Sequence, residues 1–220
     1  MAGPSVLIVE DHAILSYAVA GALTSAGCER VDVHDVDRLD ADAVLDAVEK
    51  LRPDVVLLDL DLGGGRRGVP LIAPMMQLGS TVLILTASDD EIVFGEALEA
   101  GAAAVLTKSQ PFHRLADAVH AAAAGERLVP AATRDALVSD WRRRRDMGSN
   151  QMARFDKLTT SEAAVLEALV DGCSVEVIAA SRGVAIGTVR SQVKAVLRKL
   201  QVGSQLAAVA RAREAGWPRR

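Results

Sequence analysis

Aromatic side chains and cysteine are scarce in this sequence. Only 3% of its 220 residues are aromatic although 50% are hydrophobic, so a core must be built mainly from Ala, Val and Leu. Such a composition suits helices packed on a buried parallel sheet. The two cysteines, Cys28 and Cys173, lie far apart in the chain, which predicts two reduced thiols rather than a disulfide or a metal site.

The features of a secreted or membrane protein are also absent. The first apolar run, Val6–Val9, is too short for a signal peptide, and no basic segment precedes it. No later stretch reaches about 18 apolar residues without a charge. We therefore expect a cytoplasmic protein that has no membrane partner.

The net charge of −4 conceals two halves of opposite sign. Residues 1–124 hold 19 acidic and 8 basic side chains, a balance of −11, and residues 125–220 hold 10 and 17, a balance of +7. The length suits two domains. A basic half is consistent with nucleic-acid binding, although a solvated surface would have the same composition.

The first half alternates short apolar runs with amphipathic stretches, which predicts an α/β domain of five βα repeats over residues 1–124. The expected strands are 6–9, 31–33, 55–58, 82–85 and 103–106. The expected helices are 13–26, 41–51, 71–78, 92–100 and 115–124. In such a domain the functional residues follow the carboxyl ends of the strands.

The pattern breaks at residues 125–154, where we expect a linker helix over Ala131–Arg145 and a flexible hinge over Asp146–Gln151. Residues 155–220 then predict a small all-α domain. It opens with a capping box, Thr159 to Glu162. Its four expected helices are 161–171, 175–182, 187–200 and 206–215.

Charged and polar residues follow four of the expected strands: Glu10 and Asp11, then Asp59, Thr86 and Lys108. We expect them to meet at one edge of the sheet. Three carboxylates in one place stay ionised only beside a cation, which favours a hard divalent ion such as Mg²⁺. Asp59 is then a nucleophile for phosphoryl transfer, with the metal, the Lys108 ammonium and the Thr86 hydroxyl to neutralise oxygen charge.

At these positions the sequence resembles the receiver domain of two-component systems. The motifs are V-E-D at 9–11, V-V-L-L-D-L-D at 55–61, L-T-A at 85–87 and A-V-L-T-K at 104–108. The resemblance covers residues 5–124 and implies a flavodoxin-like (βα)5 fold. It also implies a sensor histidine kinase as the partner.

The resemblance assigns a role to each residue of the site. Asp59 is the phosphoacceptor, and Glu10 and Asp11 bind Mg²⁺ together with Asp59 and the main-chain carbonyl of Asp61. Thr86 is the switch hydroxyl, and Lys108 contacts the phosphoryl group.

Two features depart from the family pattern. Val105 stands where the family usually has an aromatic switch residue, three positions before the lysine. The loop after the phosphoacceptor commonly reads D-x-x-M-P-G, whereas residues 59–68 here read D-L-D-L-G-G-G-R-R-G.

Alternative interpretations of the same residues remain. Residues 63–68 match G-x-x-x-x-G, but Val69 and Pro70 follow in place of Lys-Ser/Thr, which argues against a P-loop. The D-x-D of Asp59 and Asp61 resembles haloacid-dehalogenase phosphatases, whose acidic pair comes late in the chain rather than first. A third alternative is an orphan regulator that binds DNA without phosphorylation.

Residues 158–208 resemble the LuxR-type helix-turn-helix domain. The motifs are L-T-x-x-E at 158–162, V-L at 165–166, G-C-S at 172–174, I-A-A at 178–180, G-T-V-R-S-Q-V-K at 187–194, L-R-K-L at 197–200 and V-G-S at 202–204. With the receiver, this places the chain near the NarL/FixJ subfamily of response regulators. We therefore expect a DNA-binding transcription regulator, not an enzyme, that forms a homodimer when active.

The third expected helix of this domain has one apolar face, and its basic residues fall largely outside that face. The resemblance implies that Arg190, Ser191 and Lys194 face base edges. It places Thr188, Arg198 and Lys199 nearer to phosphates. Two positions depart from the family here: Ala185 replaces the usual Ser or Thr helix cap, and Gln192 replaces a frequent His.

Overall fold

The computed structural model describes residues 3–34 and 40–218. The chain divides into two compact units, Met1–Arg142 and Arg143–Arg220, and each is described by itself. Among the helices of the described residues, none combines the length and the apolar composition that a membrane span needs.

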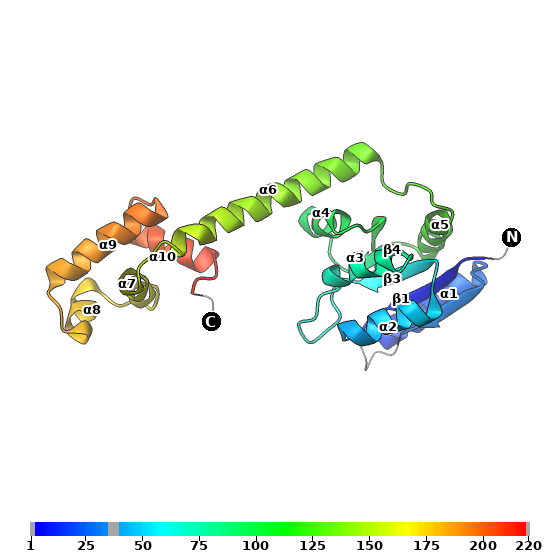
Figure 1. Cartoon of the computed structure of the whole chain (residues 1–220), viewed down its shortest axis with the longest axis horizontal. Coiled ribbons are helices and arrows are strands. Elements are labelled where there is room, and N and C mark those ends of the chain that lie inside the picture. The colour runs from blue at the N-terminus through cyan, green and yellow to red at the C-terminus, as the bar shows by residue number, and fades with distance from the viewer. Residues whose placement is uncertain (1–2, 35–39, 219–220) are drawn as a thin grey trace. The chain divides into compact units, whose positions relative to one another are not determined.

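The first unit is built on a parallel five-stranded sheet with the order β2-β1-β3-β4-β5. This is the flavodoxin-like order, which confirms the predicted fold class. Figure 1 labels its three central strands, β1, β3 and β4. All five residues of β3 are buried, as expected of a strand covered on both faces. The strands are β1 Ser5–Val9, β2 Arg30–Val33, β3 Val55–Asp59, β4 Thr81–Thr86 and β5 Ala104–Thr107.

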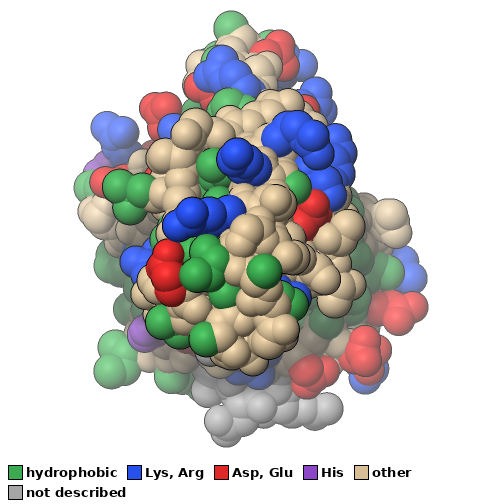
Figure 2. Space-filling view, turned by 90° about the vertical axis from the view of Figure 1, so that its left-hand side faces the viewer, with side chains coloured by type: hydrophobic (Ala, Val, Ile, Leu, Met, Phe, Trp, Pro, Cys, Tyr) green, Lys and Arg blue, Asp and Glu red, His purple; other side chains and the backbone are tan. Residues whose placement is uncertain are grey.

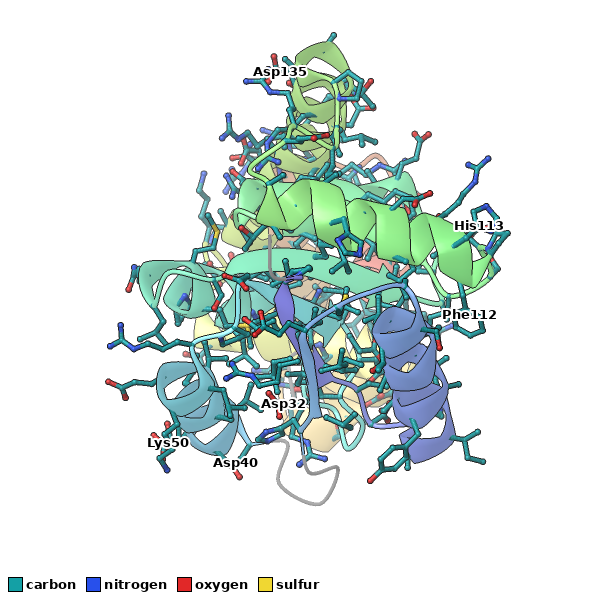
Figure 3. The ribbon with its side chains drawn as sticks, turned by 90° about the vertical axis from the view of Figure 1, so that its right-hand side faces the viewer. Asp32, Asp40, Lys50, Phe112, His113 and Asp135 are labelled. Atoms are coloured by element: carbon teal, nitrogen blue, oxygen red, sulfur yellow. The ribbon has the colours of Figure 1, made fainter. Side chains whose placement is uncertain are left out.

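Five helices cover the two faces of this sheet, and Figure 3 shows α1 and α2 on opposite sides of the central strands. Val19 and Leu115 are buried in the core beneath α1 and α5, whereas Val44 and Ile72 are buried in the core beneath α2, α3 and α4. The helices are α1 Ala13–Ser25, α2 Ala41–Leu51, α3 Val69–Gln77, α4 Glu91–Glu99 and α5 Phe112–Ala123. All ten elements lie within three residues of their predicted bounds.

The linker is one helix, α6, over Ala131–Phe155. The prediction of a hinge at Asp146–Gln151 is wrong, because these residues are helical. The stretch has no proline, and its one glycine, Gly148, costs a helix only about 1 kcal/mol. Within the first unit, the Arg134 guanidinium donates to the carbonyls of Leu98 and Ala102 near the end of α4. Within the second unit, Phe155 is 3% exposed.

The second unit contains the four predicted helices: α7 Thr160–Val170, α8 Val175–Arg182, α9 Ile186–Leu200 and α10 Gln205–Glu214. The predicted capping box is present, since the Glu162 amide donates to the Thr159 hydroxyl and the Thr159 amide donates to the Glu162 carboxylate. Phe155 stacks on Trp217 with ring centroids 5.4 Å apart, so the end of α6 is part of this core.

The continuity of α6 predicts the effect of Gly148→Ala. An added Cβ at Gly148 would meet nothing within 4 Å, so the substitution should raise the free energy of unfolding by about 0.5–1 kcal/mol through helix propensity alone. Chemical denaturation of the full chain measures it. The matched change Gly95→Ala should destabilise, because its Cβ would lie 2.3 Å from the Leu137 carbonyl oxygen. A neutral or destabilising Gly148→Ala would mean that this stretch is not helical in solution.

Candidate functional sites

The predicted acidic residues meet at the carboxyl edge of the sheet. Glu10 directly follows β1 and is 1% exposed, and Asp59 ends β3 and is 4% exposed. Lys108 follows β5, and its ammonium lies 2.7 Å from Asp59 Oδ2 and 2.7 Å from Glu10 Oε2. The three strands therefore bring two buried carboxylates onto one cation, as their positions in the sequence predict.

Burial and the neighbouring charges shift the pKa values of Glu10 and Lys108. Burial raises the pKa of Glu10, and the Asp59 charge adds to that effect, whereas hydrogen bonds from Lys108 and His12 oppose it. Burial alone would lower the pKa of Lys108, but its bonds to Asp59 and Glu10 outweigh burial and raise this pKa. Lys108 therefore stays an ammonium that is shared by both carboxylates.

The same cluster fits a divalent cation. Glu10, Asp11, His12 and Asp59 each offer one ligand atom, and these atoms lie within 4.8 Å of one another. Among the described residues, Asp11 Oδ1 is buried and accepts no hydrogen bond, although the His12 ring nitrogen lies 2.7 Å away. A set dominated by carboxylate oxygens suits a hard cation such as Mg²⁺.

His12 is a member of this cluster that the sequence analysis missed. Its Nδ1 lies 2.9 Å from Glu10 Oε1, and the hydrogen bond to Glu10, together with the charge of Asp11, raises the pKa of the imidazole. Its position next to the acidic pair was the available signal. Asp61, in contrast, is exposed, and its carboxylate accepts a hydrogen bond from the Gly63 amide at 3.1 Å.

Thr86 lies at the same cavity, as predicted. It ends β4, is 5% exposed, and its hydroxyl accepts a hydrogen bond from the Ser88 amide at 3.1 Å. The cavity has a volume of about 510 Å³, and Asp59, Thr86, Lys108 and the loop residues Arg66 and Arg67 line it. The space beside Asp59 is thus open and faced by cations.

The glycine-rich loop between β3 and α3 forms a small hairpin. Asp61 and Arg67 form an antiparallel bridge, and the Gly68 amide donates to the Leu60 carbonyl at 2.9 Å. A Cβ at Gly68 would lie 2.1 Å from the Asp59 carbonyl oxygen, so only glycine permits this approach. Arg67 directly precedes Gly68 in this loop. The close contact of the Gly68 backbone with Asp59 therefore keeps Arg67 near the cavity.

The predicted apolar and polar faces of α9 are present. Val189, Val193, Val196 and Leu200 are buried, whereas the exposed residues are Thr188, Arg190, Ser191, Lys194 and Arg198. Figure 2 faces this unit and shows several Lys and Arg side chains with fewer acidic ones between them. The N-cap residue of the helix is Ala185, which offers no side-chain cap, as the sequence predicts.

Lys199 has a different environment from the other predicted DNA contacts. Its ammonium lies 2.5 Å from Glu162 Oε2, and the two side chains are only 25% and 10% exposed. The bond from Lys199 lowers the pKa of Glu162 despite the opposing effect of burial. Lys199 therefore joins α9 to the capping box of α7, an interaction across 37 positions that local sequence patterns do not reveal.

Comparisons with known proteins find a family for each of the two units. Residues 6–120 match the family described as response regulator receiver domain, and residues 156–212 match the bacterial regulatory proteins of the luxR family. The chain is a response regulator: it belongs to the family of DNA-binding transcription regulators of two-component systems that join a receiver to a LuxR-type domain.

Similar proteins span nearly the whole chain. The transcriptional regulatory protein DesR of Bacillus subtilis is 29% identical over 97% of this chain and 98% of its own length. The nitrate/nitrite response regulator protein NarP of Escherichia coli is 31% identical over 92% of this chain and 91% of its own. A solved structure of the Salmonella typhimurium response regulator RcsB shares the fold, with 21% identity, a TM-score of 0.51, and coverage of 96% and 98%.

The Lys199–Glu162 pair predicts a pH-dependent loss of stability in Lys199→Ala. The bond from Lys199 lowers the folded-state pKa of Glu162, so the stabilisation is fully present above the ordinary carboxyl pKa of about 4.3 and is lost as the pH falls from there through the lowered folded-state pKa. At neutral pH the variant should lose about 1 kcal/mol of unfolding free energy. Urea denaturation at several pH values measures the difference.

Lys194→Ala is the matched control, because Lys194 is exposed on the same helix. It should change stability by less than about 0.5 kcal/mol. A Lys199→Ala variant that is as stable as the control at neutral pH would show that the ion pair contributes nothing.

Proposed function

We propose that Asp59 is the residue that accepts the phosphoryl group from a sensor histidine kinase. The observation that carries this proposal is the buried Asp59 carboxylate, 2.7 Å from the Lys108 ammonium, in a cavity that Thr86 also lines. Asp59 attacks as an anion, so no general base is needed: its bond to phosphorus forms as the donor's bond to phosphorus breaks.

The surrounding residues then stabilise the aspartyl phosphate. Lys108 moves its contact from the Asp59 carboxylate to a phosphoryl oxygen, and the Thr86 hydroxyl donates to another. Glu10 and Asp11 would hold Mg²⁺ with Asp59 and the carbonyl of Asp61, and the ion supplies positive charge for the phosphoryl oxygens. We assign no enzymatic turnover to this site: the aspartyl phosphate is a signal, and the donor is the kinase.

The second unit carries the output of this signal. We propose that α9 enters the major groove, with Arg190, Ser191 and Lys194 facing base edges and with Thr188 and Arg198 nearer to phosphates. The exposure of these five side chains supports the assignment. Arg190 also pairs with Glu176, but that pair is exposed and its atoms are 3.7 Å apart. Lys199 is left out of the assignment, since its short and largely buried ion pair with Glu162 competes with a phosphate contact.

We also propose that the protein acts in the cytoplasm as a homodimer, which phosphorylation of the receiver favours. The family supports the place of action, because similar proteins are named as transcriptional regulators and a transcription regulator acts where the DNA is. Exposed apolar side chains on α1, Ile14 at 88% and Tyr17 at 70%, offer surface for contact between copies.

Treatment with a small phosphodonor in Mg²⁺ should add one phosphoryl group to the chain, and Asp59→Asn should abolish the addition because the amide is not a nucleophile. Intact-mass spectrometry measures the label, and sedimentation velocity tests for the dimer in the same samples. Asp117→Asn, an exposed position on α5, is the control and should label fully. Undiminished labelling of Asp59→Asn would refute the assignment, and an unlabelled wild type that still binds DNA would favour the orphan regulator.

Substitutions on α9 should separate base contacts from phosphate contacts. Arg190→Ala and Lys194→Ala should each cost about 1–3 kcal/mol on a preferred site and relax the preference at one position. Arg198→Ala should weaken binding to all sequences and lower the salt slope by about one ion. Binding to selected and scrambled duplexes at several salt concentrations measures both effects. Equal losses on both duplexes for all three variants would mean that α9 does not read sequence.

A further inference from the structure

Arg67 has a position that the family pattern does not explain. It comes from the glycine-rich loop, lines the cavity beside Asp59, and precedes the glycine whose backbone abuts the Asp59 carbonyl. Its guanidinium nevertheless pairs with Glu96 on α4, with 2.5 Å between Arg67 Nη2 and Glu96 Oε2. The Arg67 side chain is 61% exposed and the Glu96 side chain only 15%, so the guanidinium has solvent space in which to turn towards the cavity.

A second acceptor for this guanidinium arises when Asp59 carries a phosphoryl group. The group adds up to two negative charges and three oxygens to the cavity that Arg67 lines. A guanidinium matches phosphate oxygens in a bidentate geometry, which makes phosphate a stronger partner than a single carboxylate oxygen. Glu96 and the phosphoryl group therefore compete for the same cation.

We infer that Arg67 is a phosphoryl-binding residue of this receiver, and that it leaves Glu96 for the phosphoryl group on Asp59. This inference rests on the proposed role of Asp59. The exchange of Arg67 would connect the phosphoryl group to α4 through Glu96. This chain has Val105 at the usual switch position, which offers no aromatic ring for that connection.

The release of Glu96 reaches the linker because α4 and α6 are packed without spare room. A Cβ at Gly95 would lie 2.3 Å from the Leu137 carbonyl oxygen and 2.8 Å from the Trp141 Cβ, so the two helices nearly touch there. One turn from Glu96, Glu99 pairs with the Arg142 guanidinium at 2.8 Å. A shift of α4 that follows the loss of its counter-ion must therefore move the first half of α6.

The competition is tested by titrating the full chain with beryllium trifluoride in excess Mg²⁺. This anion binds an aspartate carboxylate and stands for the phosphoryl group, and ¹⁹F NMR counts the bound form directly. Arg67→Ala should raise the half-saturating concentration about tenfold, because a charge-assisted contact is lost. Glu96→Gln should lower it about threefold, because the competitor for Arg67 is weakened. The double variant should behave like Arg67→Ala.

Arg66→Ala is the matched control for the loss of one positive charge from the loop. The Arg66 side chain folds back on its own turn, where Nε donates to the Gly63 carbonyl at 3.0 Å. Arg66 also lines the cavity, so its loss should raise the half-saturating concentration by about twofold through charge alone, well short of the tenfold effect expected of Arg67→Ala, because the Arg66 guanidinium is already bound within the loop. An equal loss in Arg66→Ala and Arg67→Ala would overturn the inference in favour of a general electrostatic effect.

Trp141 reports the consequence for α6. In a Trp217→Phe background it is the sole tryptophan, and its emission should change on saturation with beryllium trifluoride but not in Arg67→Ala. If both Arg67→Ala and Glu96→Gln bound beryllium trifluoride more weakly, the Arg67–Glu96 pair would have only a structural role. That result would overturn the proposal that Arg67 exchanges Glu96 for the phosphoryl group. Normal binding by Arg67→Ala would overturn this inference alone, whereas no bound signal in the wild type would overturn the role of Asp59 as well.

Discussion

The sharing of one ammonium by two buried carboxylates is the constraint on which the receiver depends. Asp59 and Glu10 end or follow neighbouring parallel strands, and both are almost fully buried. Two such charges repel each other in a medium of low polarity, so they stay ionised only beside a cation. Lys108 supplies it at 2.7 Å from each. An anionic group that enters the cavity would therefore compete with Asp59 and Glu10 for the Lys108 ammonium.

The surroundings of this charge cluster are fixed by close backbone contacts rather than by bulky side chains. Gly68 lets the loop reach the Asp59 carbonyl, and Gly95 lets α6 lie against α4. Neither contact leaves space for a methyl group, so the backbones that meet at Gly68 and at Gly95 are in direct contact and close-packed. In a chain with 3% aromatic residues, small residues and charged pairs take the place of large rings at these junctions.

Sequence patterns were sufficient where a signal is local or periodic. Parallel strands gave continuous apolar runs, and the helices of the second unit gave caps and apolar stripes, so their bounds were predicted within three residues. The break expected at Asp146–Gln151 is absent because polar residues without proline do not interrupt a helix, and Gly148 costs it only about 1 kcal/mol.

The sequence by itself determined the strands, the residues that follow them and hence which acidic residues lie together, because the carboxyl ends of parallel strands must share one edge. The order of the strands was implied by the family resemblance and is seen in the tertiary structure. Only the tertiary structure decided how cations are divided among acids that are distant in the chain. In the folded chain, Lys199 pairs with Glu162 rather than facing solvent, and Arg67 pairs with Glu96 beside the cavity that Asp59 lines. The partners of long, flexible charged side chains depend on which surfaces folding brings together, and no local period in the sequence records that.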